Sequence, residues 1–125
     1  DDRHKPEPFT SLIRCVNTTY DGEFAFEVRD VWVNPELRGQ RMGCAMMLHA
    51  FVHYSSKQFK NGIVYVPQGM PGADAFFQKV GFRRQVQERL PGRIRRHMYS
   101  LWVLRNVHHH VGRLEEIMQH YRGKE

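Results

Sequence analysis

Residues 31–43 read VWVNPELRGQRMG and decide the fold. The stretch begins as a strand of β-branched and aromatic residues, and Asn34-Pro35 ends that strand because proline lacks an amide donor. A turn with glycine and arginine then leads into residues 42–54, which contain no Asp, Glu, Lys or Arg and favour a helix. The orphan amides and positive dipole at the start of such a helix can receive a phosphate once glycine lets the backbone approach it. The pattern therefore predicts a phosphate cradle between a strand and a helix, with a plain structural turn as the alternative.

This turn resembles the acetyl-coenzyme A motif of the GCN5-related N-acetyltransferase (GNAT) family. The family motif is Arg or Gln, two variable residues, Gly, one variable residue, then Gly or Ala. Arg38 and Gly43 occupy its first and last positions, and Arg41 stands where the family most often has Gly. Residues 73–82, ADAFFQKVGF, are similar to the family's later motif Ala-x-x-Phe-Tyr-x-Lys-x-Gly-Phe. The resemblance covers residues 24–105.

The resemblance implies transfer of an acetyl group from acetyl-coenzyme A (acetyl-CoA) to a primary amine by direct attack. In the family, two adjacent strands separate and the pantetheine arm lies between them, while the turn before the helix holds the pyrophosphate. The cofactor-binding residues that it implies here are Val31, Val33, Arg38, Gly39, Gln40, Arg41, Met42, Gly43 and Phe77.

Catalysis by direct attack needs a base, because the amine must be neutral to attack, and the leaving thiolate benefits from an acid. Family members often place a Glu on the strand before the motif, and Glu23 and Glu27 share one face of that strand here. Glu27 is the predicted base, directly or through water, and a solvated strand face is the alternative for both carboxylates. Phe77 replaces the Tyr that is frequent in the family. Tyr65 is the candidate acid in its place, with burial in the core as the alternative.

No metal site is predicted. His108, His109 and His110 are consecutive, and successive residues on a helix point about 100° apart, so these side chains cannot converge on one ion. His49 and His53 share a helix face, but the sequence supplies no third ligand for them.

On both sides of residues 31–43, the chain alternates between strand and helix patterns. Residues 1–9 are a loose lead-in, 10–106 the GNAT-like domain and 107–125 an additional amphipathic helix. The expected fold is α/β or α+β, with a mixed, mostly antiparallel sheet flanked by helices. The predicted elements are strands at 10–17, 24–33 and 63–66, helices at 42–54, 73–80 and 107–121, and two strands within 82–105 joined at Leu90-Pro91-Gly92.

The beginning of the chain departs from the family, which usually has a strand and two helices before this part of the sheet. Either the domain is minimal, or the missing part lies upstream in a longer chain, or another subunit supplies it. The terminal helix carries an apolar stripe that suggests a homodimer or a partner chain as a further hypothesis. The stripe consists of Val107, Val111, Leu114, Met118 and Tyr121.

Composition sets the remaining expectations. Nineteen Lys and Arg against thirteen Asp and Glu give a net charge of +6, which favours an anionic partner. Two cysteines cannot build a disulfide framework, so we expect a reducing compartment, the cytoplasm. The sequence contains no run of 18 apolar residues, so we expect no membrane span.

Two other functions stay open beside the transferase. One is a degenerate GNAT fold that binds without turnover. The other is a nucleic-acid-binding protein, which is supported by the charge and by an arginine cluster but lacks interleaved aromatic residues. The acceptor, a small molecule or a protein, also stays open. The arginine cluster consists of Arg83, Arg84, Arg89, Arg93, Arg95 and Arg96.

Overall fold

The computed structural model describes residues 11–33, 41–86 and 98–122, and the side chains of these residues up to His120. The elements follow one another in the predicted order, so each periodicity identified in the sequence corresponds to a helix or a strand. The predicted turn at Leu90-Pro91-Gly92 and the lead-in at 1–9 lie outside the described residues. The elements are β1 (Ser11–Tyr20), β2 (Glu23–Val33), α1 (Met42–Ser56), β3 (Asn61–Pro67), α2 (Pro71–Val80), β4 (Arg83–Arg84), β5 (Tyr99–Leu104) and α3 (Val107–Arg122).

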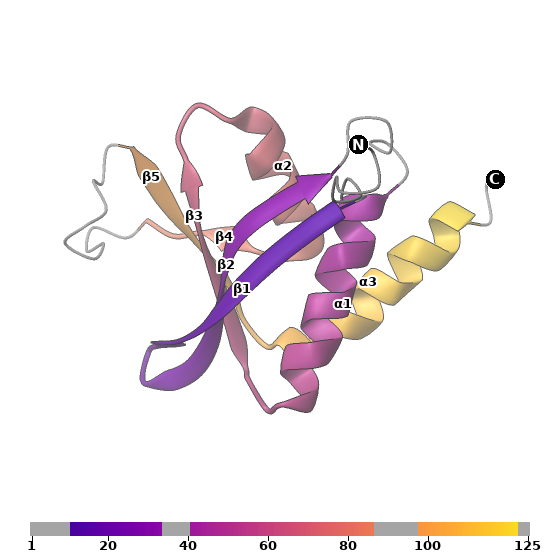
Figure 1. The fold of residues 1–125 in the computed structure, drawn as a ribbon, viewed down its shortest axis with the longest axis horizontal. Helices are drawn as coiled ribbons and strands as arrows, with labels where there is room; N and C mark the ends of the chain where they lie inside the picture. Colours follow the sequence, from indigo (N-terminus) through magenta and orange to yellow (C-terminus); the bar gives the residue numbers. More distant parts are fainter. Residues whose placement is uncertain (1–10, 34–40, 87–97, 123–125) are drawn as a thin grey trace, which may run out of the picture.

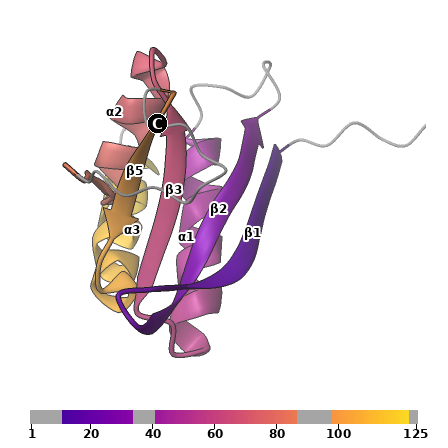
Figure 2. The same ribbon diagram turned by 90° about the vertical axis from the view of Figure 1, so that its left-hand side faces the viewer.

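The strands form one five-stranded sheet in the order β1-β2-β3-β5-β4 (Figure 1). β2 and β3 pair in parallel, whereas the other three pairings are antiparallel. The three described helices all lie on the same side of the sheet, and Figure 2 shows the strands in front with the helices behind them. The mixed, mostly antiparallel sheet with helices confirms the predicted fold class.

The β1–β2 hairpin closes through a two-residue turn. Asp21 and Gly22 have φ values of 54° and 78°, the left-handed conformation that a tight hairpin turn requires. Gly81 ends α2 with φ 119°, the left-handed conformation of a glycine helix cap. A Cβ atom at Gly81 would lie 2.5 Å from Nδ1 of His110, so glycine also allows α3 to pack closely there.

The main core lies between the sheet and the helices. α1 supplies Met47 and Phe51, both fully buried, which explains why its sequence has no charged residue. α3 packs beside α1, with Leu114 fully buried and Met118 8% exposed. Three residues of the stripe, Val107, Leu114 and Met118, are therefore part of the chain's own core. The structure gives no support to a homodimer through this stripe, because these three apolar side chains are already covered within the chain.

Candidate functional site

The two neighbouring central strands, β2 and β3, pair with each other over only part of their length. β2 and β3 pair from Ala25↔Asn61 to Val28↔Val64. Beyond these pairs β2 continues beside β1 and β3 continues beside β5, but the facing edges no longer pair with each other. Figure 2 shows the two strands diverging toward their carboxyl ends. The structure thus has the strand separation that the family resemblance implies.

A β-bulge gives this separation a physical cause. Arg14 pairs with Asp30 while the next residue, Cys15, pairs with Val28, so Arg29 is an extra residue on β2. A bulge bends its strand and increases the local twist. It lies directly after Val28, the last residue of β2 that pairs with β3. The bend therefore begins where the pairing ends.

The first turn of α1 lies at the same end of the sheet as the separation (Figure 1). Arg41 precedes the helix with φ 60° and ψ 22°, a left-handed conformation that favours glycine. That conformation explains why the family most often has Gly at this position. The amides of Met42, Gly43 and Cys44 precede that of Ala45, which donates the first intrahelical hydrogen bond, to the carbonyl oxygen of Arg41 at 3.0 Å. The first turn of α1 thus has the polarity of an anion site, and no acidic side chain opposes it there.

Gly43 also serves the packing of the two helices. A Cβ atom at this position would lie 2.9 Å from Cε1 of Phe76, so the ring of α2 closes over the first turn of α1 only because a glycine stands there. Three of the predicted cofactor-binding residues, Arg38, Gly39 and Gln40, lie outside the described residues.

The cysteine at the start of α1 is not activated. Burial raises the pKa of the Cys44 thiol, and the nearby Arg41 charge offsets this only in part. Burial likewise raises the pKa of Cys15 to about 11. Both thiols stay protonated at neutral pH, so neither has the character of a nucleophile.

A group of polar side chains lies on the helix-free face, at the beginning of the separation. Glu27 of β2 has a side chain only 15% exposed, and its Oε2 lies 2.9 Å from Nε of Arg29. Tyr65 of β3 follows Val64, the last paired residue of that strand. Burial and then the charge of Glu27 raise the pKa of Tyr65, and Tyr20 acts in the same direction while Arg29 opposes it. The separation therefore brings a carboxylate, a phenol and a guanidinium together across two strands.

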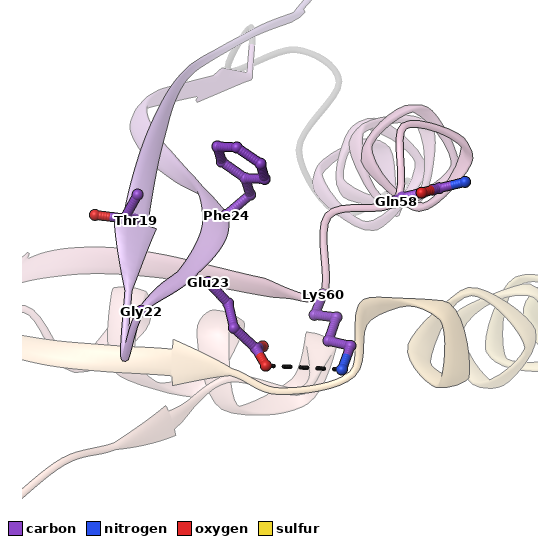
Figure 3. A pocket seen from close by; sticks show the side chains of 6 residues that line it. All are labelled: Thr19, Gly22, Glu23, Phe24, Gln58 and Lys60. Atoms are coloured by element: carbon purple, nitrogen blue, oxygen red, sulfur yellow. Dashed lines mark ion pairs between the residues drawn. The ribbon is translucent and has the colours of Figure 1, made fainter.

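Glu23, the second predicted carboxylate, lies elsewhere. Its side chain is 47% exposed, forms an ion pair with Lys60 at 3.7 Å and accepts a hydrogen bond from Asn61 at 3.3 Å. Figure 3 shows the Glu23–Lys60 ion pair in a shallow pocket at the closed end of β2 and β3. Glu23 is thus held at the end opposite the separation, and Glu27 alone lies beside Tyr65.

The apolar residues predicted at the cofactor lie on the helix side. Val31 packs against the main core, and Val33 is half-buried at the end of β2. Phe77 is 7% exposed, and its ring meets that of Phe82 edge-on at a centroid distance of 5.5 Å. Phe77 is therefore a core residue, and its contact with a cofactor stays a prediction.

Sequence reasoning missed Arg29. The signal was present as two consecutive charged residues, Arg29 and Asp30, in the middle of a strand where alternation would face one of them toward the core. Such a break in the alternation is typical of a bulge, because one extra residue shifts the facing of all that follow.

Other kinds of site find less support. Over residues 11–33, 41–86 and 98–122, no group of three His, Cys, Asp or Glu side chains could hold a metal ion. None of the helices in these ranges is long and apolar enough to cross a membrane. Within the arginine cluster, Nη1 of Arg83 donates to the carbonyl oxygens of Gln78 and Phe82, so this side chain already forms hydrogen bonds with the protein backbone. Arg89, Arg93, Arg95 and Arg96 lie outside the described residues.

Comparison with solved structures identifies the fold. No protein-family model and no curated protein sequence matches the chain. A GNAT-family acetyltransferase from Staphylococcus aureus Mu50 superposes with a TM-score of 0.64 at 13% identity, over 78% of this chain and 60% of that one. The chain has a GNAT fold.

Two further structures contain coenzyme A. The NatC complex bound to Gag peptide and CoA matches with a TM-score of 0.63 at 14% identity, over 84% of this chain and 67% of that one. A Bacillus subtilis acetyltransferase in complex with CoA gives 0.62 at 13% identity, over 81% and 72%. This chain spans between 60% and 72% of the length of these three GNAT-fold chains.

Proposed function

We propose that this protein is an N-acetyltransferase that moves an acetyl group from acetyl-CoA to an amine. The observation that carries the proposal is the separation of β2 from β3 beside the first turn of α1, with Glu27 and Tyr65 at its inner end. The CoA-bound GNAT-fold structures support the same assignment. Two cysteines without a disulfide between them are consistent with the reducing cytoplasm as the location that we propose.

The described residues fit acetyl-CoA in two places. The facing edges of β2 beyond Val28 and of β3 beyond Val64 do not pair with each other, so their backbone groups are not used for strand pairing there and suit hydrogen bonds to the amides of pantetheine. The first turn of α1, from Met42 to Cys44, suits a phosphate group. When bound, acetyl-CoA supplies a thioester whose carbonyl carbon is the electrophile.

Glu27 and Tyr65 divide the proton transfers between them. The amine nitrogen forms the new C–N bond as the C–S bond breaks, and the carboxylate of Glu27 accepts the proton that the nitrogen loses. The phenol of Tyr65 donates its proton to the leaving sulfur. Because burial and Glu27 raise the pKa of Tyr65, this phenol keeps its proton at neutral pH and is available as an acid.

A thiol-release assay tests the proposed function. The purified protein, mixed with acetyl-CoA and a panel of amines, is expected to release free CoA thiol at a rate that depends on both protein and amine. Binding of acetyl-CoA without release by any amine would instead support the degenerate fold, for which the lack of a hydroxyl group at Phe77 argues. A steep loss of nucleic-acid affinity with salt, in the absence of thiol release, would support the nucleic-acid-binding alternative.

A further inference from the structure

The carboxylate proposed as the base is already part of an ion pair. Nε of Arg29 lies 2.9 Å from Glu27, and the Arg29 side chain is half-exposed. A guanidinium has five N–H donors. In the described part of the chain, the terminal nitrogens of Arg29 form no other ion pair or hydrogen bond. Arg29 can therefore bind a second anion while it stays beside Glu27.

The bulge places this guanidinium on the helix-free face. Asp30 pairs with Arg14 and faces the same side as Glu27, so two consecutive residues of β2, Arg29 and Asp30, face the same way. Without the extra residue, the alternation of the strand would point one of them toward the core. The bulge in β2 thus places a cation, Arg29, beside the proposed base Glu27.

The charge of this cation selects among acceptors. A simple ammonium that approaches Glu27 also meets the positive charge of Arg29, and the ion pair as a whole has no net charge with which to attract it. A zwitterion matches the pair, because its ammonium complements Glu27 while its carboxylate complements Arg29. The close approach of Glu27 and Arg29 requires the two groups of the acceptor to be close as well. In an α-amino acid they are attached to the same carbon atom.

We propose that Arg29 binds the carboxylate of the acceptor, so that the preferred acceptor is a free α-amino acid. This inference rests on the proposed function and specifies its substrate class. Arginine suits the role because its planar fork matches a carboxylate in a bidentate arrangement, whereas lysine offers one point charge.

The test compares acceptors that share the side chain but differ in the carboxylate, with kcat/KM expressed per concentration of neutral amine, because an amide lowers the pKa of the neighbouring amine. Thiol release is measured with standard L-amino acids and with the corresponding L-amino acid amides, which keep the amine and the side chain. The free acid is expected to be the better acceptor by about tenfold in kcat/KM, the ratio expected for one partly exposed charge-assisted hydrogen bond. Dipeptides with an N-terminal Asp distinguish a side-chain carboxylate from the α-carboxylate, and they are expected to react no better than the amides.

Two variants separate carboxylate binding from a merely structural role. Arg29→Gln is expected to raise KM for the free acid about tenfold and to change KM for the amide by less than about twofold. Arg29→Lys is expected to restore part of the loss. Arg14→Gln is the matched control, because it breaks the neighbouring Arg14–Asp30 ion pair on the same face, and it should change neither KM.

Three outcomes would overturn the inference. Equal reaction of acids and amides with the wild-type protein would do so even if Arg29→Gln failed to fold. An equal loss for both acceptors in Arg29→Gln would show that Arg29 only positions Glu27. Preference for the Asp dipeptides would assign the guanidinium to a peptide side chain instead. In these three cases acetyl transfer itself stands, whereas absence of thiol release with every amine would reject the proposed function.

Discussion

Replacing Glu27 with glutamine is expected to lower kcat/KM for acetyl transfer by about 10²- to 10⁴-fold, the contribution typical of a positioned general base. The amide keeps the size of the side chain but cannot accept the proton of the attacking amine. Glu27 is suited to this change because its side chain is 15% exposed and lies beside Tyr65. The thiol-release assay, run at a fixed acetyl-CoA concentration over a range of amine concentrations, measures the loss.

The control is Asp30→Asn, which makes the same chemical change on the same strand and face but outside the Glu27–Tyr65 pair. It is expected to leave kcat/KM within about twofold of wild type, as is usual for an exposed ion pair. A deficit that is equal in the two variants would remove Glu27 from the role of base.

Replacing Leu114 with alanine is expected to lower the free energy of unfolding by about 2–5 kcal/mol, the usual cost of a cavity at a buried leucine. Leu114 is fully buried where α3 joins the main core. Urea denaturation of the wild-type and variant proteins measures the difference.

Glu115→Ala is the matched control on the same helix, because Glu115 is exposed, and a surface change of this kind is usually within about 0.5 kcal/mol. Light scattering on both variants separates the core from an interface. Two outcomes would instead assign the stripe of α3 to a contact between chains. One is an effect of Leu114→Ala on stability as small as that of the control, and the other is a halving of the molecular mass without a loss of stability.

Local patterns in the sequence were enough to predict much of the fold. The stripe from Val107 to Tyr121 predicts a terminal helix with one apolar face, and α3 is that helix, although its stripe was interpreted as a contact with another chain whereas Leu114 and Met118 lie in the chain's own core. The uncharged run from Met42 predicts a helix, and α1 packs against both the sheet and α3. These predictions succeed because periodicity reports directly which face of an element is buried.

The site was harder to predict because it depends on pairing between distant segments. Glu27 and Tyr65 come together only because β2 and β3 are neighbours in the sheet and stop pairing beside them. Arg29 joins them through a bulge that is defined by its pairing with β1. The burial of Phe77 likewise depends on Phe82, which the helix pattern alone does not place. Alternation along one strand therefore identified the carboxylate but not its partners.

Backbone NMR spectra recorded during a titration with CoA test the central claim most directly. The account predicts that the largest amide shifts fall on the separated ends of β2 and β3, residues 29–33 and 65–66, and on the first turn of α1. The closed end of the same strands, around Glu23 and Asn61, should shift little. Shifts concentrated at that closed end, or no shifts at a CoA concentration of about 1 mM, the upper end of common KM values, would contradict the account.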